Sequence, residues 1–148
     1  MRVAEVMTRD VQTVSPSDTI QKAAATMDNL NVGALPVCDG ERLQGVITDR
    51  DITVRATAAG QSPSETKVGD VMTGEIDCVF EDDDVEEAVN KMKARQIRRL
   101  PVINREKKLV GVVSLGDLAT KTDDAGSAAE ALKHVSKPSR PDRDRKKK

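Results

Sequence analysis

The sequence has almost no aromatic residues: it contains no Trp and no Tyr, and Phe80 is its only Phe. A bound nucleobase would therefore have to lie between aliphatic side chains, because no aromatic platform is available for stacking. Histidine and cysteine are also scarce, since His134 is the single His, and Cys38 and Cys78 lack a CxxC spacing. These residues are too few for a zinc site or a disulfide framework. Cys38 is expected to be a small buried strand residue, and His134 a solvated residue of the tail.

The sequence also lacks an excess of one charge and any long apolar run. Its 24 basic and 25 acidic residues give a formal net charge of −1, which argues against general attraction to nucleic acid. No apolar run approaches the ~20 residues of a membrane span, and residues 1–5 are polar, unlike a secretory signal. We therefore expect a cytoplasmic protein that has neither a membrane nor a nucleic acid as its partner.

The sequence does contain an internal repeat, which organises most of the chain. Three motifs occur twice in the same order. They are V-x-x-V-M-T at 3–8 and 68–73, L-P-V at 35–37 and 100–102, and G-V-[IV]-[TS]-x-x-D at 45–51 and 111–117. Each unit of about 60 residues would bury too little surface alone, so the two units are expected to share a core. The expected organisation is repeat 1 at 1–60, a linker at 61–67, repeat 2 at 68–120 and a tail at 121–148.

Each copy shows the same predicted order of elements: strand, helix, strand, strand, helix. The elements expected in repeat 1 are a strand at 11–14, a helix from 20 to about 27, strands at 34–38 and 43–48, and a helix from 51 to 59. Those expected in repeat 2 are a strand at 76–79, a helix from 85 to about 92, strands at 100–103 and 109–114, and a final helix. The pattern predicts a mixed α/β (α+β) protein.

Two clusters along the chain are expected to be structural. The acidic run at 81–84 precedes a predicted helix, where carboxylates cap free N–H groups and interact favourably with the helix dipole. A metal site is the alternative for this run, and we interpret it as capping. Val6 and Met7, with their counterparts Val71 and Met72, are expected to be apolar anchors with no ligand role.

The third motif places a hydroxyl and a carboxylate at the start of a helix in both copies. Thr48 and Ser114 end a predicted strand, where a hydroxyl and free backbone N–H groups can hold a phosphate. Asp51 and Asp117 follow one turn later, so that their carboxylates can accept hydrogen bonds from ribose hydroxyls. The alternative is a purely structural N-cap with an acidic residue in the first turn. The residues alone suit both interpretations.

Taken together, the duplicated motifs of residues 1–120 resemble a tandem pair of cystathionine-beta-synthase (CBS) domains, the Bateman module. The resemblance implies two β-α-β-β-α repeats related by a pseudo-twofold axis, with their sheets packed together and two clefts between them. It also implies regulatory binding of an adenosine-containing ligand, dimerisation of the module, and signalling to an effector protein. AMP, ADP, ATP, NAD and S-adenosylmethionine are the candidate ligands. A metal and a catalytic cofactor are not expected.

The resemblance further implies that each cleft combines the loop of one repeat with the first strand of the other. Site A is expected to comprise Thr48, Arg50, Asp51, Ile76, Cys78, Val79, Arg98 and Arg99. Site B is expected to comprise Ser114, Gly116, Asp117, Val11, Thr13, Val14, Gly33 and Ala34. Because Gly33 and Ala34 stand where repeat 2 has two arginines, site A is predicted to take the longer phosphate chain. The alternative for the arginines is a solvated strand start or a dimer contact.

The tail differs in composition from the two repeats. S-A-A-E at 127–130 is a capping-box pattern that predicts a short helix, and the basic end after Pro138 is expected to be disordered. Three functions are compatible with these features: a ligand-sensing regulatory module, a dimerising scaffold with non-functional clefts, and an accessory part of an IMP dehydrogenase-type enzyme. The first is favoured, because Thr48, Asp51, Ser114 and Asp117 are all present and no catalytic set is recognisable.

Overall fold

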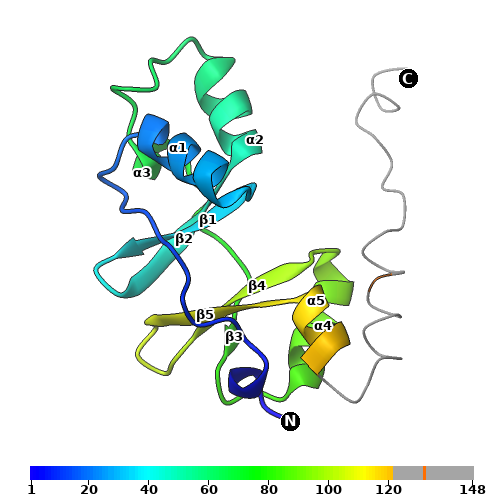
Figure 1. Ribbon diagram of the computed structural model, residues 1–148. Helices are drawn as coiled ribbons and strands as arrows, with labels where there is room; N and C mark the ends of the chain where they lie inside the picture. Colours follow the sequence, from blue (N-terminus) through cyan, green and yellow to red (C-terminus); the bar gives the residue numbers. More distant parts are fainter. Residues whose placement is uncertain (122–131, 133–148) are drawn as a thin grey trace.

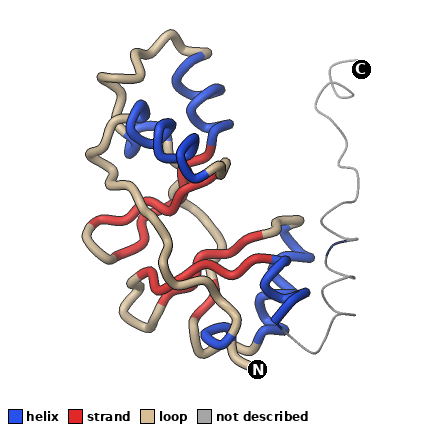
Figure 2. Tube along the Cα trace, in the orientation of Figure 1, coloured by secondary structure: helices blue, strands red, loops and turns tan. Residues whose placement is uncertain are grey.

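The computed structural model describes residues 1–121 and Leu132, so the predicted tail helix and basic end lie outside the described residues. Two mixed α/β halves face each other through their sheets, and most of the helices lie on the far side of each sheet (Figure 1). Figure 2 shows the loops that pass between the halves. The fold is therefore the predicted pair of α/β repeats.

Repeat 1 is built on one helix and one hairpin. Helix α1 (Ile20–Leu30) begins where the Thr19 hydroxyl accepts a hydrogen bond from the Lys22 N–H (3.2 Å), and it ends at Asn31 in the left-handed conformation. Strands β1 (Ala34–Asp39) and β2 (Arg42–Thr48) pair antiparallel. The predicted helix and both strands are confirmed. The buried face of α1 packs against the hairpin and forms a hydrophobic cluster with it.

The last helix of repeat 1 departs from regular α-geometry. Helix α2 (Asp49–Asp51) is a single turn that continues into the π-helix η2 (Ile52–Thr57), in which the Ala58 N–H donates to the Thr53 carbonyl at 2.9 Å. Single turns of π-helix are rare and occur often at functional sites. This turn directly follows the Thr48 loop.

Repeat 2 has the same arrangement of helix and hairpin, with a third strand in its sheet. Strand β3 (Val79–Phe80) pairs parallel with β4 (Arg99–Ile103), which pairs antiparallel with β5 (Leu109–Ser114). Helix α4 (Val85–Arg95) precedes β4, and α5 (Leu115–Lys121) follows β5 without a break. The strands and the helix predicted over 85–114 are confirmed.

The first predicted strand of each repeat is wrong or shortened. At 11–14 only Val14 pairs, in an isolated parallel bridge with Val37, and at 76–79 only Val79 joins a strand. These segments cross from one sheet to the other, so most of their residues have no neighbouring strand (Figure 2).

The acidic run at 81–84 differs in part from its prediction as a helix cap. Asp84 occupies the N-cap position of α4 without a side-chain hydrogen bond, whereas Asp83 Oδ2 accepts from the Phe80 N–H (2.9 Å).

The leading segments of the two repeats are exchanged. The 3₁₀ helix η1 (Val3–Glu5) packs into repeat 2, and α3 (Val68–Val71) packs beside α1 in repeat 1 (Figure 1). Val3, Val6 and Met7 are buried in the same hydrophobic cluster as Met92 and Leu100 of repeat 2. Val68 and Val71 are buried in the cluster of repeat 1. The valines and Met7 are the apolar anchors that the sequence predicts, but each anchors its segment to the other repeat.

Backbone hydrogen bonds fix the exchange in both halves. The N–H and C=O groups of Thr8 pair with those of Val112, at 2.9 Å in each direction. Thr73 pairs in the same way with Val46, at 2.9 and 3.0 Å. Each exchanged segment therefore adds one residue to the edge of the other repeat's hairpin. The arrangement is the same in both halves, as a pseudo-twofold relation requires.

The two hairpins touch at their tips. The Leu109 N–H donates to the Glu41 carbonyl (2.9 Å), and the Leu43 N–H donates to the Lys107 carbonyl (3.2 Å). Lys108 Nζ also lies 3.3 Å from a Glu41 carboxylate oxygen. The sheets are thus joined at the turn ends of both hairpins. Thr48 and Ser114 lie at the opposite ends of the strands, where a cleft separates the two repeats.

Candidate functional site

A large cleft lies between the strand ends of the two repeats. It has a volume of about 930 Å³, within the range of small-molecule sites, and both loop hydroxyls line it. The predicted site residues that line it come from both expected sites. They are Ala34, Thr48, Arg98, Arg99, Ser114 and Gly116. Val46, Ile97 and Leu115 supply apolar wall.

The strand register explains why these residues meet. Ala34 lies opposite Thr48 in the β1–β2 ladder, and Arg99 lies opposite Ser114 in the β4–β5 ladder. The Leu115 N–H also donates to the Arg98 carbonyl at 2.8 Å. Backbone pairing therefore places the two arginines next to the Ser114 loop. They line the same cleft as Thr48, with which the sequence analysis grouped them.

The side chains of Arg98 and Arg99 are exposed. Neither guanidinium makes a hydrogen bond or an ion pair with any residue of the described ranges. Other arginines nearby are paired, since Arg95 lies 3.1 Å from Asp77 and Arg105 binds Asp82 at 3.0 Å. Two unpaired guanidinium groups beside two hydroxyls suit an anionic ligand, because each guanidinium can bind phosphate oxygens bidentately.

The Thr48 loop is held by reciprocal hydrogen bonds. The Asp51 N–H donates to Thr48 Oγ1, and the Thr48 N–H donates to Asp51 Oδ2, both at 3.0 Å. The Thr73 hydroxyl of the exchanged segment donates to the same carboxylate at 3.3 Å. As a result, Asp51 is only 8 % exposed. This arrangement is the capping box that the sequence analysis gave as the structural alternative.

The Ser114 loop repeats this geometry. The Asp117 N–H donates to Ser114 Oγ (3.0 Å), and the Ser114 N–H donates to Asp117 Oδ2 (2.9 Å). Lys121 Nζ lies 3.1 Å from Asp117 Oδ1. Each carboxylate oxygen has two acceptor sites, so a capping role leaves both aspartates able to accept a further hydrogen bond. Neither aspartate side chain is among the residues that line the cleft.

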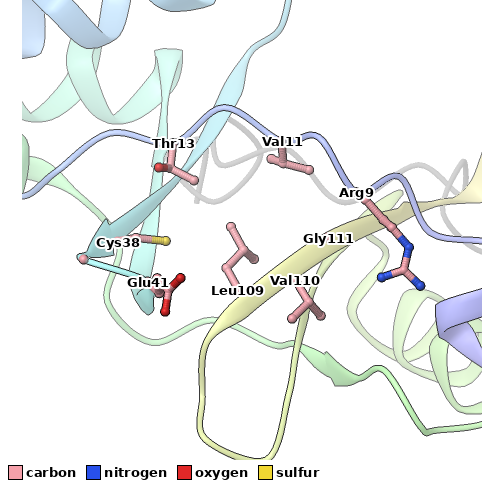
Figure 3. A pocket seen from close by; sticks show the side chains of 9 residues that line it. Arg9, Val11, Thr13, Cys38, Glu41, Leu109, Val110 and Gly111 are labelled. Carbon is pink, nitrogen blue, oxygen red and sulfur yellow. The ribbon is translucent and has the colours of Figure 1, made fainter.

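The remaining predicted site residues lie elsewhere. Val11 and Thr13 line a second pocket of about 180 Å³, beside Leu109 and the inward-pointing sulfur of Cys38 (Figure 3). Cys38 is 5 % exposed, as predicted for a buried strand residue, and this burial raises the pKa of its thiol. Four further residues are outside both spaces. Val14 and Val79 are buried in the two cores, and Ile76 and Cys78 are half-buried on the segment that crosses between the sheets.

The basic residue expected in site A and the glycine expected in site B also lie away from the cleft lining. Arg50 is exposed, and its N–H donates to Asp49 Oδ1 at 2.8 Å. Gly33 is exposed, and its carbonyl accepts from the Asp49 N–H (3.0 Å). The ligand role of every predicted residue therefore stays a prediction, and the cleft residues are those that the geometry favours.

Sequence reasoning missed Arg55, Lys121 and Thr73. Arg55 Nε lies 3.8 Å from Asp51 Oδ1, and Lys121 pairs with Asp117 in the same i, i+4 spacing. A signal was present in the sequence, because a cation follows each motif aspartate by four residues. Thr73 carried no local signal, since its contact with Asp51 depends on the exchange of the leading segments.

Within residues 1–121 and Leu132, no group of three or more His, Cys, Asp or Glu side chains is placed to hold a metal ion. None of the helices in this described part is both long enough and apolar enough to cross a lipid bilayer.

Comparison with known proteins identifies two CBS domains in this chain. The family model described as "CBS domain" matches residues 3–56 and 68–124. The CBS domain-containing protein YhcV of Bacillus subtilis is 44 % identical over 134 residues, which are 90 % of this chain and 94 % of that protein. The inosine-5'-monophosphate dehydrogenase of Methanocaldococcus jannaschii is 39 % identical over 115 residues, but these are only 22 % of the enzyme. The similarity to the dehydrogenase therefore concerns its CBS part.

Two solved structures illustrate the similarity of fold. Hypoxic Response Protein I, solved with two coordinated zinc ions, has a TM-score of 0.75 and 35 % identity, covering 82 % of this chain and 99 % of that one. A hexameric CBS-CP12 protein from bloom-forming cyanobacteria has a TM-score of 0.67 and 28 % identity, covering 84 % of this chain and 70 % of that one. The zinc and the hexamer are properties of those two proteins.

Proposed function

The chain belongs to the CBS domain family, and from this premise we propose that it is a regulatory module that binds an adenosine-containing nucleotide between its two repeats. One observation carries the proposal. The unpaired guanidinium groups of Arg98 and Arg99 line the same cleft as the hydroxyls of Thr48 and Ser114. A cleft with two free cations and two hydroxyl donors is suited to phosphate groups.

The apolar wall of the cleft, and the two carboxylates that are hydrogen-bonded to the cleft residues Thr48 and Ser114, suit the rest of such a ligand. Val46, Ile97 and Leu115 offer an aliphatic surface for a nucleobase, which the chain needs because it has no Trp or Tyr. The carboxylates of Asp51 and Asp117 are the candidates for ribose hydroxyls, since a carboxylate can accept from two neighbouring hydroxyls. The proposed ligands are AMP, ADP, ATP, NAD and S-adenosylmethionine, and those with phosphates are favoured.

The position of the arginines bears on the number of ligands. Some residues of each expected site line the same cleft, and Arg98 and Arg99 are the only charged residues among the described ones that line it. Two phosphorylated ligands would have to share this pair of cations. The proposal is therefore one phosphate chain per protein chain, held where the two repeats meet.

The proposed output is a conformational change that an effector protein detects. Binding in a cleft made by both repeats would favour one arrangement of the repeats over others, and only such differential binding can shift a conformational equilibrium. We propose no catalytic role, and we expect the module to act as a homodimer in the cytoplasm. The relative described as hexameric supports self-association in the family.

The first experiment is to purify the protein, record its absorbance spectrum and identify any small molecule released by acid. Because the chain has no Trp or Tyr, it absorbs weakly in the usual aromatic region, and a co-purified adenine nucleotide would be conspicuous. Calorimetric titration with AMP, ADP, ATP, NAD and S-adenosylmethionine follows. Recovery or binding of one of them would support the proposal. An empty protein that bound none of them would contradict it.

A dimerising scaffold is the second candidate, and one observation favours it. Both capping boxes satisfy their hydroxyl, carboxylate and N–H groups without any ligand. A scaffold would show the same closed loops, would bind none of the five ligands, and would retain its oligomeric state in sedimentation experiments when Arg98 and Arg99 are both replaced by Ala.

A further inference from the structure

Arg55 joins the carboxylate of one repeat to the backbone of the other. Its Nη1 donates to the carbonyls of Val71 (3.2 Å) and Met72 (3.0 Å), which belong to the exchanged leading segment of repeat 2. Its Nε lies 3.8 Å from Asp51 Oδ1 in repeat 1. A single side chain therefore contacts both the motif aspartate and the segment that crosses to reach it.

Lys121 forms the equivalent connection in the other half of the molecule. Its Nζ donates to the Val6 carbonyl (3.2 Å) and lies 3.1 Å from Asp117 Oδ1. Val6 occupies the same place in the first motif copy as Val71 does in the second. The same connection therefore occurs in both halves of the molecule, with a different cation in each.

The carbonyls that these cations bind have no helical partner. Val71 is the last residue of α3, and Val6 is the C-cap of η1. Carbonyl groups at helix ends lack an intrahelical donor, and a cation there is favourable because it supplies one. Each cation thus stabilises the docked position of a leading segment.

The aspartate is the shared member of this network. Asp51 accepts from the Thr48 N–H at 3.0 Å and from the Thr73 hydroxyl at 3.3 Å while it pairs with Arg55. A new hydrogen bond to this carboxylate therefore changes the strength of its bonds to Thr73 and Arg55, which hold the leading segment of repeat 2. Linked equilibria are reciprocal, so an effect of ligand on the segment implies an equal effect of the segment on ligand affinity.

We propose that Arg55 and Lys121 are positioning residues that orient the carboxylates of Asp51 and Asp117 and couple each of them to the leading segment of the opposite repeat. The part that concerns ligand affinity rests on the proposed function, whereas the coupling to the leading segment does not. In this view, ligand binding at the motif aspartate of one repeat alters the docking of the other repeat's leading segment.

The coupling is tested without ligand by amide hydrogen exchange in the full chain. In Arg55→Ala, exchange of the Val46 and Thr73 amides should rise about tenfold, because their mutual bridge loses its nearby support. The Thr8 and Val112 amides should keep their wild-type rates. Lys121→Ala should show the reverse pattern, so each variant is a control for the other.

Conservative and matched variants separate positioning from general damage. Arg55→Lys and Lys121→Arg should restore most of the protection, since each cation already serves in the other half. Arg105→Ala removes an ion pair that stays within repeat 2, to Asp82 at 3.0 Å, and should leave both bridges unchanged. Equal increases at all bridge amides in Arg55→Ala, or no increase at any, would overturn the coupling.

The ligand part is tested with adenosine and inorganic pyrophosphate. Arg55→Ala should weaken adenosine binding about fivefold, a typical coupling, and leave pyrophosphate affinity unchanged because Arg98 and Arg99 remain. Equal losses for both probes would overturn the positioning role. If the wild-type chain bound neither probe, the proposed function and the ligand part would fail together, and the exchange pattern would still decide the coupling.

Discussion

Gly45 lies against the carbonyl oxygen of Thr73 so closely that a Cβ atom at position 45 would overlap it. The two residues come from different repeats and are brought together by the exchange of the leading segments. Gly111 has the same relationship to Thr8, whose carbonyl oxygen would lie 2.6 Å from an added Cβ. The glycine that opens each G-V-[IV]-[TS]-x-x-D motif is therefore required by packing, whatever the cleft binds.

Gly45→Ala is expected to destabilise the protein by about 2 kcal/mol, because the added methyl group must displace backbone and not a flexible side chain. Gly111→Ala should have a similar effect through Thr8 and Met7. Urea unfolding followed by circular dichroism measures both. Gly74→Ala is the control, since nothing lies within 4 Å of its added Cβ. An unchanged midpoint in Gly45→Ala would mean that the leading segment is not docked as described.

Replacement of Arg98 and Arg99 by Ala is expected to weaken ATP binding about a hundredfold, which corresponds to roughly 2.7 kcal/mol. Adenosine affinity should change much less, because adenosine carries no phosphate. Calorimetric titration of both ligands gives the comparison. Arg50→Ala is a matched control, since Arg50 is exposed but does not line the cleft. Equal losses for ATP and adenosine would indicate that the arginines are structural.

Thr48→Ala should cost about 1 kcal/mol of stability, because it removes one member of the capping box, and Asp51→Ala should cost more, because Asp51 also accepts from the Thr73 hydroxyl and pairs with Arg55. Their effects on adenosine should differ. Asp51→Ala removes the proposed ribose acceptor and should weaken adenosine about tenfold, whereas Thr48→Ala retains the carboxylate. Thermal unfolding and calorimetry on the same samples measure the two effects. If both variants bound adenosine equally, the carboxylate would have only its capping role.

Stability is expected to fall in acid partly through Asp18. The Ser15 N–H donates to its Oδ2 at 2.8 Å, and this bond, helped by Lys22, lowers the pKa of Asp18 from its ordinary value of 3.8. A carboxyl whose pKa is lower in the folded state stabilises the protein above pH 3.8, and this stabilisation is lost as the pH falls through the lower native value.

Asp18→Asn should therefore be less stable than the wild type at neutral pH and should lose less stability between pH 5 and about 2. Urea midpoints measured across this range give the slope. Asp10→Asn is the control, because the Asp10 carboxylate makes no hydrogen bond or ion pair within the described part of the chain. Identical slopes for Asp18→Asn and the wild type would contradict the lowered pKa.

Much of the fold followed from local patterns. The helices that begin at Ile20 and Val85 and the four strands of the two hairpins start and end within a few residues of their predicted positions. Helical spacing, turn residues and alternating burial are local signals, so they can be recognised without knowing the partner of each segment. The predicted strand at 11–14 was wrong because its apolar residues serve a crossing between sheets.

The residues of the candidate site were recognisable from the sequence, whereas part of their arrangement was not. The hydroxyls and carboxylates of Thr48, Ser114, Asp51 and Asp117 were identified from a duplicated motif. Their capping boxes were one of two interpretations left open by the residues. The grouping of Arg98 and Arg99 with Thr48 was expected from the family resemblance. The presence of the Ser114 hydroxyl in the same cleft could not be foreseen, because it depends on how the strand ends of two repeats approach each other.

The sequence by itself determined the two repeats, their elements and the residues that can bind an anion. The tertiary structure alone decided that residues 3–8 pack into repeat 2 and residues 68–73 into repeat 1. The physical reason is that the two segments share the same apolar pattern, so each could fill either core. Only the three-dimensional path of the chain selects between them, and the same choice places Arg55 and Lys121 between the repeats.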